Sequence, residues 1–150
     1  MEHDAHQYTG CGLDNIWLIN GFEITETAYG EAVSYRDIDG LHRAIGMSIA
    51  ESNAPLTAAE FKFLRRELDW TQNHLAKLLS VDEQTVGRWE REEVALTGPA
   101  QTVIRLLYLT YCENKNVKRI VDDLAAIDSS PINRRFYSLE KDHWAFDEAA

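Results

Sequence analysis

Apolar residues recur at helical spacing in two short adjacent stretches within residues 71–90, which we call the helix pair. Thr71 and Asp82 precede the two stretches, and each has a side-chain oxygen that can cap a helix N-terminus. The apolar positions are Leu75, Ala76, Leu79, Val81, Val86 and Trp89. Each helix is too short to be stable alone in water, so the pattern predicts a pair within a packed unit.

The second helix of the pair is predicted to have a polar outward face. That face consists of Glu83, Gln84, Gly87 and Arg88. Two short helices joined by a tight turn, with a polar face on the second, are typical of a helix-turn-helix. In that motif the second helix enters the DNA major groove.

Residues 56–110 resemble the Cro/XRE family of phage-repressor-like DNA-binding domains. The family pattern is matched by Leu64-Arg65, Thr71-Gln72-Asn73-His74-Leu75-Ala76 and the run from Val81 to Glu90. Two positions depart from it, because Ser80 and Glu92 stand where the family usually has glycine. A Ser costs more than a Gly if the turn needs a positive φ. The resemblance implies a lambda-repressor-like helix-turn-helix bundle.

Gln84 and Arg88 are the best candidates for reading DNA bases. They are four residues apart and therefore share a helix face. Arg can bond guanine O6 and N7, and Gln can bond adenine N6 and N7. Glu83 has two open interpretations, a reader of cytosine N4 or a surface ion-pair partner. By resemblance the base-reading positions are Glu83, Gln84, Gly87 and Arg88, and the phosphate-binding positions are Thr71, Gln72, Asn73, Thr85 and Arg91.

Residues 1–54 are predicted to form a β-meander plus a helix. A β-prone run at 16–19 precedes Asn20-Gly21, a strong hairpin signal, and residues 22–27 and 32–36 continue as strands. A helix over 39–52, capped by Asp39, is expected to pack on this three-stranded sheet. Residues 1–10 are expected to be poorly ordered.

Residues 55–128 are predicted to form the helix-turn-helix domain. Thr57 and Glu60 form a capping box, and the helix that follows turns Phe61, Leu64 and Leu68 inward. Arg65 and Arg66 are placed on its other side, either solvated or at phosphates, and Trp70 is expected to close the gap to the helix pair. Thr97-Gly98-Pro99 marks the start of a further helix, whose strongly apolar part is residues 100–113. Another helix is predicted over 116–127, and residues 129–150 are a hairpin or an extended arm.

The helix over 100–113 carries an unusually wide apolar stripe. The stripe consists of Val103, Leu106, Leu107 and Tyr111, widened by Ile104 and Tyr108. It fits a central core helix, or a helix that serves both the core and a dimer seam. Because one helix in one groove gives little specificity, we predict a homodimer held by residues 98–128 or the C-terminal tail. Such a dimer would read a palindromic operator with half-sites about 34 Å apart.

Charge is unevenly distributed along this 150-residue chain of net charge −10. Residues 1–54 hold two basic and nine acidic side chains, a net charge of −7, whereas residues 55–110 hold seven and eight. The cations available for DNA phosphates are Lys62, Arg65, Arg66, Lys77, Arg88, Arg91 and Arg105. An acidic surface attracts a basic protein, so the pattern predicts two faces with two partners.

The layout of a small β-plus-helix unit before a Cro/XRE domain resembles the MqsA-type antitoxins of type II toxin–antitoxin systems. The N-terminal domain of that family grips a ribonuclease toxin and carries two Cys-x-x-Cys zinc pairs. Here only Cys11-Gly12-Leu13-Asp14 remains at that place, without the partner cysteines. The resemblance implies a basic ribonuclease toxin bound through the acidic N-terminal domain, and an antitoxin that represses its own operon.

Other chemistries find little support in the sequence. His3, His6 and Cys11 have metal-ligand spacing but lack a fourth ligand, so we expect no metal and no cofactor. No catalytic motif is present, which makes a metal-dependent enzyme the weakest of three hypotheses. The second is an interaction module that keeps the helix-turn-helix only as a scaffold. Two separated cysteines and the lack of a secretory or membrane-spanning segment predict a cytoplasmic protein.

Overall fold

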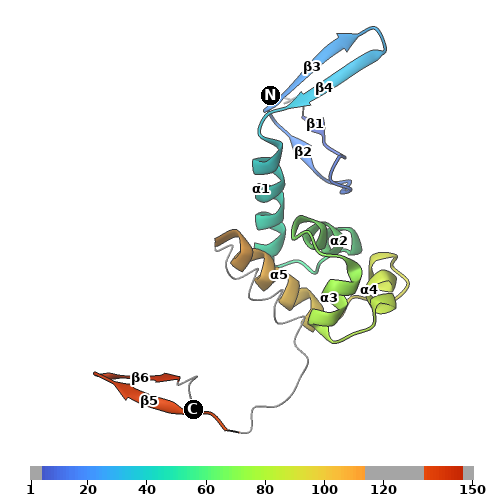
Figure 1. Cartoon of the computed structure of the whole chain (residues 1–150). Helices are drawn as coiled ribbons and strands as arrows, with labels where there is room; N and C mark the ends of the chain where they lie inside the picture. Colours follow the sequence, from blue (N-terminus) through green and yellow to red (C-terminus); the bar gives the residue numbers. More distant parts are fainter. Residues whose placement is uncertain (1–4, 114–133, 147–150) are drawn as a thin grey trace.

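The protein was analysed as a computed structural model that describes residues 5–113 and 134–146. The described residues form an α+β fold, as predicted, with helices α1–α5 and three two-stranded antiparallel sheets (Figure 1). The predicted helix over 116–127 lies outside the described residues.

The N-terminal segment forms two separate hairpins and not the predicted three-stranded meander. The strands are β1 (His6–Gln7), β2 (Trp17–Leu18), β3 (Phe22–Thr27) and β4 (Gly30–Tyr35). β2 pairs with β1, and β3 pairs with β4. β1 lies within residues 1–10, which were predicted to be poorly ordered. Asn20-Gly21 forms a bend between the two sheets, in which Gly21 adopts φ 81°. The Gly21 carbonyl accepts a hydrogen bond from the Arg36 N–H.

Helix α1 (Ile38–Glu51) begins one residue earlier than predicted. Its N-cap is Asp37, whose Oδ1 accepts the Gly40 N–H at 3.1 Å, and not Asp39. The helix packs mainly on α5 and α2, so the prediction that it packs on the sheet is wrong. The buried side chains Ile45 and Ile49 explain this, because they face the helices that follow residue 55.

Helix α2 (Ala58–Glu67) confirms the capping box and the predicted inward face. Thr57 Oγ1 accepts the Glu60 N–H at 3.1 Å, and Glu60 Oε1 accepts the Thr57 N–H at 2.9 Å. Phe61, Leu64 and Leu68 are fully buried. Trp70 is also buried, as predicted.

Helix α5 (Gly98–Glu113) contains the predicted apolar stretch 100–113 but has a different buried face. Ala100, Ile104 and Tyr108 are buried against α1 and α2, whereas Leu106 remains 59% exposed. The predicted centre of the stripe was therefore displaced by about one position around the helix. Apolar residues occur on nearly every side of this helix, so the spacing of apolar residues does not indicate which side faces the core.

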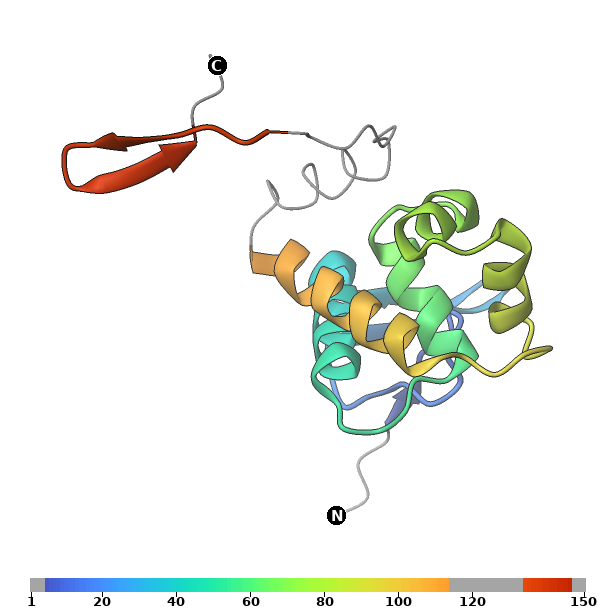
Figure 2. The same cartoon turned by 90° about the horizontal axis from the view of Figure 1, so that it is seen from below.

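A single core joins the N-terminal segment to the helices. Tyr8 and Leu13 belong to the same buried cluster as Ile45, Phe61 and Ile104. Figure 2 shows α5 lying across α1 and α2, the arrangement that closes this core. The predicted division after residue 54 does not coincide with a break in the packing.

Residues 137–146 form a hairpin, one of the two predicted alternatives for the C-terminal tail. β5 (Tyr137–Glu140) pairs with β6 (His143–Phe146), and Lys141 in the two-residue turn adopts φ 53°. The aromatic residues were expected to pack on another surface, but Phe136 and Trp144 are 45% and 70% exposed.

Gly46 marks the closest approach of α1 and α5. A Cβ at this position would collide with the ring and hydroxyl group of Tyr108. Gly46→Ala should therefore destabilise the protein by about 1–3 kcal/mol, the usual cost of overpacking, despite the better helix propensity of Ala. Urea unfolding measures the effect. Gly98→Ala is the matched control, since a Cβ there meets nothing within 4 Å; equal stability of the two variants would contradict the predicted crossing.

Candidate nucleic-acid interface

The predicted helix pair forms α3 (Gln72–Leu79) and α4 (Glu83–Glu90), joined by a tight turn. Thr71 caps α3, because its Oγ1 accepts the His74 N–H at 3.0 Å. Asp82 precedes α4 but its carboxylate makes no capping bond, contrary to expectation. The buried residues of the pair are Leu75, Ala76, Val86, Gly87 and Trp89. All but Gly87 were predicted to face inward.

Two turn residues adopt the left-handed conformation that favours glycine. Ser80, which ends α3, has φ 56°, and Glu92, which follows α4, has φ 62°. These are the two positions at which the sequence lacks the glycine of the Cro/XRE pattern. A side chain in this conformation costs roughly 1–2 kcal/mol, a cost that the packing around these two turns must offset.

The outward face of α4 consists of Glu83, Gln84 and Arg88, which are all exposed. Gly87 does not belong to it, so that part of the prediction is wrong. A Cβ on Gly87 would lie 3.0 Å from Arg91 Nη1 and 3.6 Å from Gln72 Oε1. Gly87 therefore lies under two side chains predicted to bind phosphate, and its lack of a side chain leaves room for them.

The amide of Asn73 connects the two helices at this surface. Its Nδ2 donates to Glu83 Oε2 at 3.4 Å, a long bond between exposed groups. Thr85, another predicted phosphate contact, is half-buried beside them. Glu83 thus adopts the surface-partner role that the sequence left open, with an amide and not with a cation.

Glu90 is the centre of a buried polar network behind α4. Its carboxylate accepts bonds from Arg65 Nε and Nη2 at 2.7 and 2.8 Å, and from Gln72 Nε2 at 3.2 Å. Arg65 Nη1 also donates to the Trp70 carbonyl at 2.8 Å. The side chains of Arg65 and Glu90 are 11% and 3% exposed. A two-bond Arg–carboxylate pair fixes orientation as well as distance, so α2 holds the end of α4 in place.

Arg65 and Arg105 are therefore not available for phosphate, contrary to prediction. Arg105 donates to carbonyl groups at the C-terminal end of α1, including Ile49 O at 3.3 Å. It stabilises orphan carbonyls of a helix end, as a cation does favourably there. The basic residues that remain exposed among residues 55–110 are Lys62, Arg66, Lys77, Arg88 and Arg91.

Arg91 has an acidic partner next to the outward face. Its Nε donates to Glu93 Oε1 at 3.0 Å, and both side chains are more than half exposed. This bond, and then the charge of Arg91, lower the pKa of the Glu93 carboxyl group. Glu93 is therefore ionised at neutral pH, and a phosphate must compete with it for Arg91.

The sequence did not predict a second polar chain, which connects the N-terminal segment to α2. The Tyr8 hydroxyl lies 2.7 Å from His42 Nε2, and His42 Nδ1 lies 2.7 Å from Glu67 Oε1. Burial raises the pKa of Tyr8, with smaller contributions from Cys11 and Tyr35. No local signal identifies the chain, because its members are 25 residues or more apart. It anchors the N-terminal segment on the helical body.

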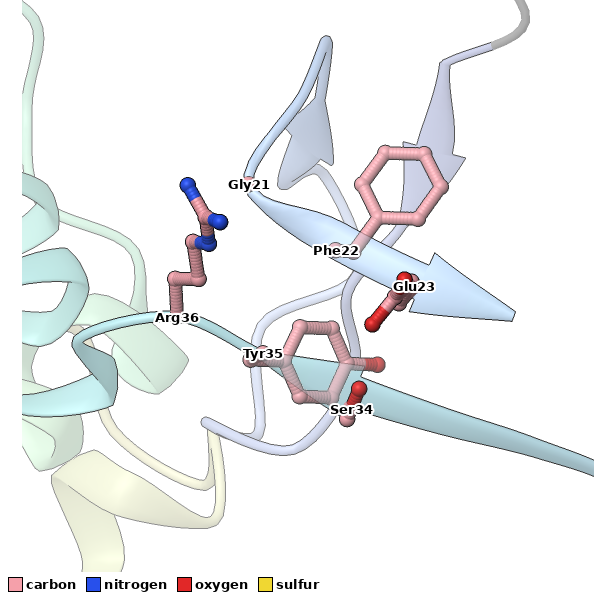
Figure 3. Close-up of a pocket in the computed structure, with 6 residues that line it drawn as sticks. All are labelled: Gly21, Phe22, Glu23, Ser34, Tyr35 and Arg36. Carbon is pink, nitrogen blue, oxygen red and sulfur yellow. The ribbon is translucent and has the colours of Figure 1, made fainter. Parts of the chain in front are cut away.

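A shallow hollow of about 300 Å³ lies at the base of the β3–β4 hairpin. Figure 3 shows Glu23, Ser34 and Arg36 among the side chains around it, with Gly21 leaving one side open. Among its lining residues, Phe22 and Tyr35 lie on one face of the two-stranded ladder, and Glu23 and Ser34 lie on the other. It lies apart from the outward face of α4.

Within residues 5–113 and 134–146, no three His, Cys, Asp or Glu side chains gather as metal ligands. His6 Nε2 instead lies 2.9 Å from the Tyr35 hydroxyl, Cys11 is a half-buried free thiol, and His3 lies outside the described residues. No helix of the described chain is both long enough and apolar enough to cross a membrane.

Comparison with known proteins found no relatives of this chain. No family model, no curated protein and no solved structure matches it.

Proposed function

We propose that the protein is a sequence-specific DNA-binding transcriptional regulator, a repressor whose α3 and α4 act as a lambda-repressor-like helix-turn-helix. One observation carries the proposal. Gln84 and Arg88, one turn apart and exposed, project from a helix whose end is fixed by the buried Arg65–Glu90 pair. Two side chains able to form paired bonds with base edges thus stand on a rigid support, as direct readout requires.

Phosphate contacts would come from the N-terminal end of α3 and the flanks of α4. Thr71 and the free N–H groups at the start of α3 form a site that favours an anion. Gln72, Asn73, Thr85 and Arg91 surround it in the proposed interface. Because several basic side chains are engaged elsewhere, we expect few phosphate contacts and a modest dependence of affinity on salt.

We propose that the DNA-bound form is a homodimer on a palindromic operator. A single short helix contacts only a few base pairs, and a two-fold dimer doubles the site by presenting two α4 helices to half-sites about 34 Å apart. A regulator of this kind acts on the chromosome, so we propose a cytoplasmic location.

We also propose that the protein is an MqsA-like antitoxin that represses its own operon. The support is the acidic N-terminal part, with a net charge of −7 over residues 1–54, together with exposed Trp17 and Ile19. Exposed apolar side chains on an acidic segment suit a basic ribonuclease toxin. Expression with a neighbouring ribonuclease gene and co-purification test this partner.

Selection from a library of random DNA duplexes tests the proposed function. We expect enrichment of an inverted repeat at low salt, with a binding affinity at least about a thousandfold above that for random duplex. Recovery of the same repeat at higher salt separates sequence readout from bulk charge. No enriched sequence at low salt would contradict the proposal.

That negative result would support an interaction module that uses the helix-turn-helix only as a scaffold. One observation favours this second candidate. Residues 55–110 carry seven basic and eight acidic side chains, and two of the basic ones, Arg65 and Arg105, are bonded inside the protein. The helical region therefore offers DNA little positive charge.

A further inference from the structure

The C-terminal hairpin has one apolar face, and that face is exposed. Residues paired across an antiparallel ladder point to the same side, and the register joins Leu139 to Trp144. Tyr137, two residues before Leu139, shares their side. These three side chains are 56–70% exposed. An isolated two-stranded hairpin is at best marginally stable in water, so a face of this kind needs a covering surface.

The β3–β4 hairpin provides a second uncovered face. Its register pairs Ile24 with Val33 and, nearer the tip, Glu26 with Glu31, all on one side of the ladder. Ile24 is 49% exposed, and the hairpin projects beyond the helical body (Figure 1). Like charges directly opposite each other destabilise a ladder. A cation close to Glu26 and Glu31 would therefore stabilise this hairpin.

The two hairpins carry opposite charges at one end of their apolar faces. Arg134 and Arg135 lead into β5 and are exposed, and Lys141 forms the turn. Two cations therefore stand at the open end of one apolar face, whereas acidic side chains stand at the tip of the other. At the turn of β5–β6, Lys141 lies between Glu140 and Asp142. Two ladders that pack face to face bury such apolar faces between them, and opposite charges at the rim fix their relative position.

We propose that the β5–β6 hairpin of one chain packs on the β3–β4 hairpin of a second copy of this chain. In Figures 1 and 2 the two hairpins of a single chain lie on different sides of the helical body, without contact. A two-fold axis would produce the contact twice, so that each chain both gives and receives a hairpin. The proposed occupant of the exposed β5–β6 face is therefore the β3–β4 hairpin of another copy.

This interface belongs to the dimer of the proposed function but does not require DNA binding. Its tests use the full-length chain without DNA, so that either proposal can fail independently. Sedimentation of the wild type should give a dimer that dissociates on dilution. Trp144→Ser should raise the dimer dissociation constant by about tenfold or more, as truncation of a buried aromatic anchor does. His143→Ser, on the opposite face of the same hairpin, is the control and should leave it unchanged.

A charge exchange separates the proposed contact from a folding defect. Arg134→Glu with Arg135→Glu should weaken the dimer, and Glu26→Arg with Glu31→Arg should weaken it similarly. A chain that carries all four changes should regain most of the wild-type affinity, because the rim charges are again opposite. Failure of the fourfold variant to recover while it remains folded by circular dichroism would overturn the proposed pairing.

Disulfide formation identifies the occupant directly. Ile24→Cys and Leu139→Cys are made in two separate chains of different length, each with Cys11→Ser and Cys112→Ser. On mild oxidation, we expect a mixed disulfide between the two chains. With both new cysteines in one chain, a crosslinked monomer would show that the hairpin covers its own body, and it would refute the second copy. A wild type that sediments as a monomer at high micromolar concentration would refute it as well.

Discussion

Glu90→Ala should destabilise the protein by about 3–5 kcal/mol, because it leaves the buried guanidinium of Arg65 without its counter-charge. The same change removes the acceptor that holds Gln72 at the start of α3. Chemical denaturation monitored by tryptophan fluorescence measures the loss. Glu93→Ala is the matched control, since its bond to Arg91 is exposed and should contribute little. Equal stabilities for the two variants would show that the pair does not hold α4.

A double replacement distinguishes a buried charge pair from simple packing. Removing one partner of such a pair leaves an uncompensated charge, whereas replacing both by apolar residues of similar size is often tolerated. Arg65→Met combined with Glu90→Leu should therefore recover much of the stability lost in Glu90→Ala. A double variant less stable than Glu90→Ala would indicate that the bonds to Trp70 and Gln72 dominate.

The combined change Gln84→Ala and Arg88→Ala should remove about 2–6 kcal/mol of discrimination between the operator and random duplex. Each residue is expected to supply about 1–3 kcal/mol at one base pair. Because the two side chains are neighbours on one helix face, the double change measures their joint contribution. Neither side chain is buried, so the fold should be unaffected. Binding titrations on the selected operator and on a shuffled sequence measure the effect.

Lys77→Ala provides the comparison for that experiment. Lys77 is exposed on α3 and can contact only the phosphate backbone in the proposed complex. Its loss should weaken binding to both sequences equally and reduce the salt dependence. If the Gln84 and Arg88 variant behaved in the same way, α4 would not be the reading helix.

Helices were predicted well because their signals are local. The capping box of Thr57 and Glu60 and the cap at Thr71 lie within four residues of what they stabilise. The β1–β2 pairing was missed because each strand has two residues and the partners are about ten residues apart. Asn20-Gly21 indicates that the chain bends there, but it does not indicate which strands pair on either side of the bend.

The interface was predicted in outline, but its supports were not. Arg65 is four residues after Phe61 and three before Leu68, so helical spacing alone places it beside the buried face. Its charge led to the opposite assignment. Only the position of Glu90 resolves the conflict, and that position depends on how α4 packs against α2. Gly46 lowers the helix propensity of its segment, and only the fold reveals that α5 approaches at this position.

The polar chain from Tyr8 through His42 to Glu67 has a thermodynamic consequence. Glu67 ends α2, the helix that also carries Arg65 and therefore positions α4. Unfolding of the helical body must break this chain and expose Tyr8 and Leu13 of the shared core. A ligand that binds only the folded N-terminal segment thus adds its binding free energy to the stability of α4. Ligand binding at the N-terminal segment and the stability of α4 are therefore thermodynamically linked, without any conformational change.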